Sequence, residues 1–217
     1  MHAESNIQIL KENRGSTVWV EQGDDGRACT IKAWSLSPWF ALKCLLGISQ
    51  PWRHWRGGRR LRRQNLASPE VLSVGLGWRG TWPVLKIRMP FIIGSTGAEQ
   101  ISESPSSLGH DIASRLGEAV SILAHAGLRH RDLKLSNIVL QHDSNEIWFI
   151  DPVGVMRDRN LVASIVCMLD RLEVEIRDGL VPRPTGATVV VLRSSIRGLG
   201  REDRRAVLQQ LRTHHSR

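Results

Sequence analysis

The run from His130 to Leu140 places three kinds of reactive side chain within six positions. Asp132 supplies a carboxylate that can accept the proton of an attacking hydroxyl. Lys134, two residues on, can neutralise charge on a phosphoryl group in transit, and Asn137 can bind magnesium through its amide oxygen. Together these groups suit the transfer of a phosphoryl group to a hydroxyl, a reaction that asks a protein mainly for positioning and charge neutralisation.

A second acidic position follows at a matching distance. The apolar run Ile147–Ile150 ends in Asp151, fourteen residues after Asn137, and Gly154 comes three residues later. Taken alone, His-Arg-Asp is common by chance, and an Asp at the end of a strand is usually a turn former. The joint pattern matches the catalytic loop and the second magnesium-binding Asp of kinases, so it predicts a site for ATP and Mg²⁺ with Asn137 and Asp151 as metal ligands. We expect His130 to brace the loop.

The surrounding elements would hold this loop in place. Apolar residues recur every three or four positions from Leu108 to Leu128, which predicts a helix that ends near Gly127 and runs into the loop. Residues 138–141 and 146–150 are predicted as short strands. Further helices are expected over residues 161–176 and 202–213.

The N-terminal part is predicted to be a small antiparallel sheet. Strands are expected over residues 6–11, 17–21 and 28–34, with turns at Gly15-Ser16 and at residues 23–26. Lys32 lies in the middle of the third strand, where a kinase places the lysine that holds the α- and β-phosphates of ATP. Gly15 and Ser16 would cover the nucleotide. An outward-facing surface lysine also fits one strand position, and this alternative stays open.

The pattern between the sheet and the catalytic loop predicts two short helices, at residues 59–66 and 70–75, and an inner strand at residues 85–93. Residues 94–107 are rich in Gly and Ser, which predicts a linker. We therefore expect an α+β, protein-kinase-like fold of two lobes. A β-rich N-lobe spans residues 1–94 with a basic, Trp-rich insertion over about 34–63. A hinge spans residues 95–107, and a short, mainly helical C-lobe spans residues 108–217.

The net charge of +9 belongs to one segment. No acidic residue lies between Asp25 and Glu70, a stretch with nine cations, whereas the remaining 21 cations balance 21 anions. Such a segment predicts an anionic partner. Trp and Arg alternate here (Trp34, Trp39, Trp52 and Trp55 with Arg53, Arg56, Arg59 and Arg60), which suits the headgroup layer of an anionic membrane. A solvated helix face with the Trp rings in the core is the alternative.

The chain resembles the lipopolysaccharide kinases of the Kdo/heptose type, the WaaP and InaA-like group, over about residues 8 to 175. The motifs that carry the resemblance are Lys11–Gly15, Ile31–Trp34, Arg62–Leu66, Val74–Gly77, His130–Leu140 and Phe149–Asp151. The resemblance implies ATP, magnesium and a sugar hydroxyl of the lipid A–core as acceptor. It also implies a cytoplasmic protein, peripheral on the inner face of the cell membrane. Three scattered cysteines and no apolar run long enough to span a bilayer agree with this location.

Two departures from the kinase pattern keep other functions open. Gln64 stands where a kinase has the glutamate that pairs with the strand lysine, and it could hydrogen-bond Lys32 but carries no charge. A pseudokinase or membrane-associated nucleotide-binding protein is therefore an alternative. Only 66 residues follow Asp151, too few for a full peptide platform, which argues against a protein substrate. A small Ser/Thr protein kinase stays an alternative, because Lys134 follows Asp132 as in that group. Nucleic-acid binding by the Arg/Trp segment is less expected.

Overall fold

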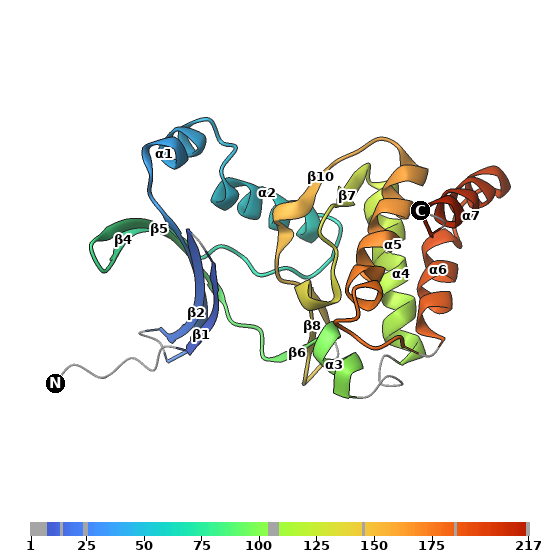
Figure 1. Cartoon of the computed structure of the whole chain (residues 1–217), viewed down its shortest axis with the longest axis horizontal. Helices are drawn as coiled ribbons and strands as arrows, with labels where there is room; N and C mark the ends of the chain where they lie inside the picture. Colours follow the sequence, from blue (N-terminus) through green and yellow to red (C-terminus); the bar gives the residue numbers. More distant parts are fainter. Residues whose placement is uncertain are drawn as a thin grey trace. The chain divides into compact units, whose positions relative to one another are not determined.

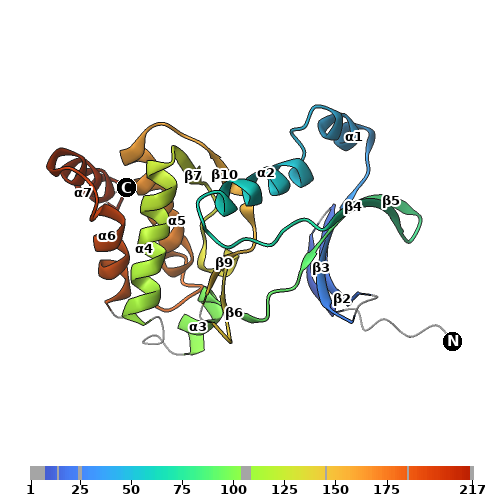
Figure 2. The ribbon, with the colours of Figure 1, turned by 180° about the vertical axis from the view of Figure 1, so that it is seen from behind.

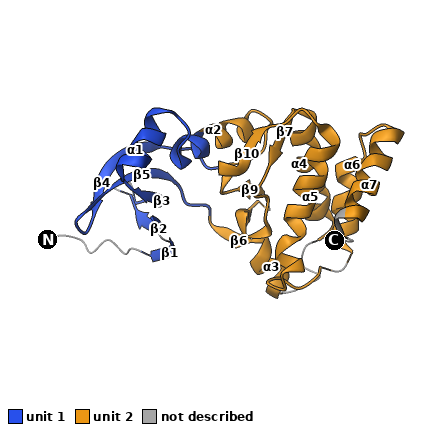
Figure 3. Ribbon diagram, turned by 45° about the horizontal axis from the view of Figure 1, so that its top comes forward, with its two compact units in different colours: residues 1–55, 69–92 blue, residues 56–68, 93–217 orange. Residues whose placement is uncertain are grey.

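The computed structural model describes residues 8–13, 15–23, 26–103, 109–144, 146–184 and 186–215, and it divides into two compact units (Figures 1 and 3). Unit 1 comprises residues 1–55 and 69–92, and unit 2 comprises residues 56–68 and 93–217. The boundary at residues 55 and 56 falls within one helix. Asp24 and Asp25 of the second predicted turn lie outside the described residues, as does Leu108.

Unit 1 is built on a five-stranded antiparallel sheet with the strand order β1-β2-β3-β5-β4. Its strands are β1 (Gln8–Asn13), β2 (Ser16–Gln22), β3 (Ala28–Ser35), β4 (Ser73–Arg79) and β5 (Trp82–Pro90). Gly15 has a φ of 87° between β1 and β2, a conformation that glycine adopts without steric cost. The first three predicted strands are confirmed, apart from residues 6 and 7, which lie outside the described part.

The register of the sheet determines the neighbours of Lys32. This residue faces Ile87 of β5 directly, and Trp34 lies two positions further along the same strand. Since alternate residues of a strand point to the same face, Lys32 shares its face with the core cluster formed by Trp34, Ile87 and Met89. Its side chain is half-buried, and its Nζ lies 5.9 Å from the centroid of the Trp34 ring. The lysine is thus not an outward surface residue.

Two helices follow β3: α1 (Pro38–Leu45) and α2 (Gln50–Arg62). Ser37 caps α1, because its hydroxyl accepts a hydrogen bond from the Phe40 N–H at 3.1 Å. Phe40 packs against the core cluster of the sheet. The indole N–H of Trp34 donates to the Gln50 side chain at 2.7 Å, which joins the start of α2 to β3.

Unit 2 contains the last turns of α2, four further helices of ten residues or more among the described residues, and several short strands. The elements are β6 (Gly94–Thr96), α3 (Gly97–Glu103), α4 (His110–His125), β7 (Leu128–His130), β8 (Ile138–Gln141), β9 (Ile147–Phe149), β10 (Val155–Arg157), α5 (Leu161–Arg177), α6 (Ala187–Ile196) and α7 (Arg201–His215) (Figures 1 and 2). Strands β6, β8 and β9 form one sheet, and β7 pairs with β10.

The core of unit 2 lies between α4, α5 and α6. The spacing that predicted α4 puts Leu116, Val120 and Leu123 on its buried face, against the buried face of α5. Gly117 allows α4 and α6 to approach closely, since a Cβ at this position would lie 2.4 Å from the Val191 carbonyl oxygen. Gly127 follows α4 with a φ of 65°, as the sequence predicts for a residue that ends a helix.

The α+β, kinase-like fold class is confirmed, but three local predictions are wrong. Residues 70–75 do not form a helix: Ser73–Arg79 is an edge strand, since Gly75 and Gly77 disfavour a helix and β5 offers a hydrogen-bonding edge. Helix α2 begins nine residues before the predicted start, because Pro51 is compatible with a first turn. Residues 94–103, predicted as part of a linker, form β6 and α3.

Candidate functional site

The catalytic loop and the segment that carries Asp151 are held together by backbone hydrogen bonds. His130 pairs with Val155 where β7 meets β10. Beside this pair, the Arg131 N–H donates to the Gly154 carbonyl at 3.1 Å, and the Ile150 N–H donates to the Asn137 carbonyl at 3.0 Å. The pattern of two short strands around each acidic residue thus produces one rigid frame, and Asp132, Lys134, Asn137 and Asp151 all belong to it.

His130 braces this frame from inside. Only 1% of its surface is exposed, and its Nδ1 accepts a hydrogen bond from the Asp132 N–H at 3.2 Å. Burial lowers the pKa of His130 to about 4, although the carboxylates of Asp151 and Asp132 and a hydrogen bond with the Asp151 backbone favour the protonated form. A neutral ring that accepts from Asp132 is the form this geometry requires. Gly154 leaves room for the ring, because a Cβ there would lie 2.9 Å from Nδ1.

Two cations contact the carboxylate of Asp132. Lys134 Nζ lies 3.5 Å from Oδ1, and Arg171 Nη2 of α5 lies 3.3 Å from the same oxygen. The Asp132 side chain remains 43% exposed, so an acceptor hydroxyl can reach it. Sequence reasoning missed Arg171. In the sequence, Arg171 is a cation in a helix whose other residues include apolar ones at every third or fourth position. It lies 39 residues from Asp132, so nothing local indicates the contact.

Helix α5 also anchors the loop at a second point. Glu175 accepts hydrogen bonds from the backbone N–H and the hydroxyl of Ser136, at 3.0 and 2.6 Å. Ser136 lies between Lys134 and Asn137, in a short 3-10 turn over Leu135–Asn137. The loop is therefore fixed from one side by His130 and from the other by α5.

Asn137 and Asp151 offer the oxygen ligands that Mg²⁺ prefers. The amide nitrogen of Asn137 donates to the Asp132 carbonyl at 2.9 Å, which leaves its amide oxygen for a metal. No group of three or more His, Cys, Asp or Glu side chains in the described residues could hold a metal ion by itself. Mg²⁺ suits a site with only one or two protein ligands, because phosphate oxygens and water complete its octahedron. The donor set therefore fits magnesium that arrives with a nucleotide.

The second half of α2 packs on the residues that follow Asp151. At Gly57 the helix approaches so closely that a Cβ would lie 1.9 Å from the Pro152 carbonyl oxygen. One turn later, Arg60 Nη1 donates to the Val155 carbonyl at 2.8 Å. Burial, together with repulsion from Arg157 and Arg56, lowers the pKa of Arg60. This arginine of the basic segment thus supports the loop that follows Asp151.

The remaining predicted residues are distributed over both units. Gly15, Ser16 and Lys32 belong to the sheet of unit 1. Gln64 belongs to unit 2 and lies beyond the end of α2, in a turn where its N–H donates to the Leu61 carbonyl at 2.8 Å. It is therefore not on the helix itself. Its role as a partner of Lys32 stays a prediction.

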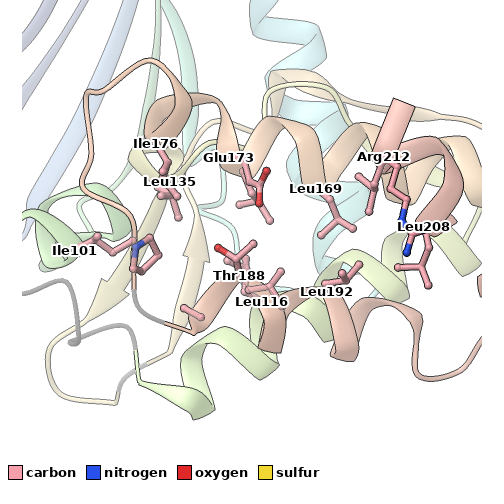
Figure 4. A pocket seen from close by; sticks show the side chains of 15 residues that line it. Ile101, Leu116, Leu135, Leu169, Glu173, Ile176, Thr188, Leu192, Leu208 and Arg212 are labelled. Carbon is pink, nitrogen blue, oxygen red and sulfur yellow. The ribbon is translucent and has the colours of Figure 1, made fainter. Parts of the chain in front are cut away.

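Unit 2 also contains an apolar pocket of about 360 Å³ between α4, α5, α6 and α7 (Figure 4). Leu135 of the catalytic loop reaches its wall, and Leu116, Leu169 and Leu192 line it, with Glu173 and Arg212 among the few polar residues. A mostly apolar wall of this kind does not supply the positive charge that would neutralise the negative charges of a triphosphate. The pocket is consequently not the nucleotide site that the loop residues indicate.

No protein-family model matches the chain, and no curated protein matches it. Many solved structures share its fold, among them the following two. One is described as WaaP in complex with acyl carrier protein, with a TM-score of 0.63 and 16% identity over 98% of this chain and 88% of the other. The second is an aminoglycoside-3'-phosphotransferase of type VIII, with a TM-score of 0.60 and 16% identity over 97% of this chain and 94% of the other. The chain has the protein-kinase-like fold that its catalytic-loop residues predict.

Proposed function

We propose that this protein is an ATP- and Mg²⁺-dependent phosphotransferase that phosphorylates a sugar hydroxyl of a lipopolysaccharide core or a similar glycolipid. The observation that carries the proposal is the frame of unit 2, where one buried histidine fixes the backbone of both Asp132 and Asp151. The kinase-like fold supports it, as does the likeness to an aminoglycoside phosphotransferase and to WaaP.

Each side chain has a defined task in this reaction. Asp132 accepts the proton of the acceptor hydroxyl and orients its oxygen for attack. Lys134, held 3.5 Å from Asp132, neutralises charge on the phosphoryl group. Lys32 binds the α- and β-phosphates, while Gly15 and Ser16 cover the nucleotide and Gln64 supports Lys32. Magnesium, held by Asn137 and Asp151, would neutralise the phosphate oxygens.

A glycolipid acceptor also places the enzyme at a membrane. No helix in the described part of the chain is long and apolar enough to cross one. We therefore propose a peripheral association with the inner face of the cell membrane, where the anionic surface attracts the nine cations between Asp25 and Glu70.

Phosphate transfer from labelled Mg·ATP to a bacterial glycolipid extract tests the proposal. Wild type is compared with Asp132→Asn, which keeps the size of the side chain and removes the base. We expect label in the lipid fraction with wild type and a loss of at least a hundredfold in rate with the variant. Label on protein instead of lipid would point to a protein kinase.

A pseudokinase is the second candidate, and two observations favour it. Gln64 stands in for the expected glutamate and lies in a turn instead of on α2. In addition, both Lys134 and Arg171 contact the carboxylate that should receive a proton. ATP binding without transfer to any fraction, in wild type and Asp132→Asn alike, would establish this function.

A further inference from the structure

Helix α1 carries apolar residues around its whole circumference. Phe40 faces the core cluster of unit 1, yet no residue of α1 is buried. Large apolar side chains instead remain exposed: Trp39 by 65%, Leu45 by 87% and Leu46 by 63%. We define the α1 surface as the exposed large apolar residues between positions 39 and 52, which are Trp39, Leu42, Leu45, Leu46, Ile48 and Trp52. Apolar side chains gathered in this way mark a contact with another body.

Helical geometry shows why this surface is continuous. At about 100° per residue, Leu42 and Leu46 fall within about 60° of Trp39, and Leu45 extends the same side. Phe40 lies about 100° away, on the side that meets the sheet. One face of the helix thus serves the fold of unit 1, and the opposite face is left to a partner.

The charges beside the α1 surface have one sign. Lys43 is the only charged residue of α1, and its Nζ lies 5.2 Å from the centroid of the Trp39 ring. In α2, which follows α1 in the chain, Trp52 meets Trp55 edge to face with ring centroids 5.6 Å apart, and Arg53 lies between them in the sequence. Tryptophan beside cations is the composition of the headgroup layer of a bilayer.

We propose that the α1 surface inserts into the headgroup–acyl boundary of an anionic lipid bilayer. The sequence grouped all Trp and Arg residues of this segment as one membrane-binding surface, but two of them stabilise the folded structure instead. Trp34 is 3% exposed and is bonded to Gln50, and Arg60 supports Val155. The inference rests on the proposed function in one respect: it identifies the part of the chain that makes the proposed peripheral membrane contact.

The composition of the surface favours a bilayer over an acidic protein or a nucleic acid. The α1 surface contains six large apolar residues, and the cations named beside it are two, Lys43 on α1 and Arg53 next to Trp52. A nucleic acid or an acidic protein would be held mainly by cations, whereas a bilayer takes up apolar side chains and adds attraction to anionic headgroups.

Flotation of the full chain with vesicles tests the proposal. The vesicles contain equal parts of phosphatidylcholine and phosphatidylglycerol, or phosphatidylcholine alone. We expect wild type to bind the anionic vesicles and the double variant Leu45→Glu/Leu46→Glu to lose at least about tenfold in partition. The matched control is Leu180→Glu/Val189→Glu, which changes the same charge at residues of unit 2 exposed by 72% and 50% and should bind as wild type does. Thermal unfolding verifies that both variants fold.

Three results would overturn the proposal. The first is that wild type does not bind vesicles, and the second is that both double variants lose the same amount of vesicle binding. The third is that α1 mediates self-association, or binds an acidic protein or a nucleic acid, without any vesicle binding. Asp132→Asn separates this inference from the proposed function, because it should bind vesicles as wild type does. If wild type binds vesicles but transfers no phosphate, the α1 surface is supported as a membrane-binding site and the proposed phosphotransferase activity is refuted.

Discussion

The buried His130 makes the stability of the catalytic loop depend on pH. The pKa of His130 is about 4 in the folded protein and 6.5 for an ordinary histidine, so between these pH values the unfolded chain binds a proton that the folded protein does not bind. The stabilisation is complete above pH 6.5 and is lost as the pH falls toward 4. Each unit of pKa corresponds to about 1.4 kcal/mol, so the full difference is about 3 kcal/mol.

The test replaces His130 by Asn. The Asn oxygen can still accept from the Asp132 N–H but does not titrate. Linkage predicts that wild type loses about 2 kcal/mol through this residue between pH 7 and pH 5. The variant should be less stable at pH 7, because of the cavity it leaves, but its unfolding free energy should fall less steeply with decreasing pH.

Urea unfolding of both proteins from pH 7.5 to pH 4.5 measures this difference. Other carboxylates titrate in both proteins, so the wild-type value minus the variant value isolates His130. Parallel curves between pH 7 and pH 5 would refute the reasoning, because they would mean that the histidine is not held neutral by burial.

Three further changes test the frame around the site. Gly57→Ala puts a carbon 1.9 Å from the Pro152 carbonyl oxygen, so we expect a loss of about 2 kcal/mol in urea unfolding, whereas Gly75→Ala, with nothing within 4 Å, should change little. If both substitutions changed the free energy of unfolding equally, the close approach of α2 to Pro152 would be contradicted. Gln64→Glu should raise the initial rate of transfer several-fold if an ion pair with Lys32 is what the enzyme lacks, and an unchanged rate favours the pseudokinase. Asp151→Asn should raise the magnesium concentration that supports half-maximal nucleotide binding by about tenfold or more. A magnesium titration equal to that of wild type would show that Asp151 is not a metal ligand.

Local patterns were sufficient to predict much of the fold, and they are the basis of the proposed site residues. Helices α4 and α5 follow from apolar residues at a helical period, and β1, β2 and β3 follow from short segments between turn residues. Residues 132–137 could be proposed as a catalytic loop because their carboxylate, amine and amide groups lie within six positions, where backbone geometry alone keeps them near one another.

Two segments that contain glycine were assigned wrongly. Residues 73–79 form a strand because β5 supplies the hydrogen bonds of an edge, and the alternation of Val74, Leu76 and Trp78 agrees with a strand. The chain after Gly94 becomes β6 because it pairs with β8 more than forty residues later. In both cases, pairing with a distant segment outweighs a composition typical of turns and linkers.

The sequence alone determined the chemical groups, their spacing along the loop and the sign of the charge between Asp25 and Glu70. Only the tertiary structure decided which residues these groups meet. Arg171 contacts Asp132 across 39 positions, and Gly57 lets α2 rest on Pro152. Only the tertiary structure, too, separated the buried Trp34 from the exposed Trp39. Short-range geometry is encoded by neighbours in the chain, whereas burial and long-range contacts arise only when distant segments of the chain pack together.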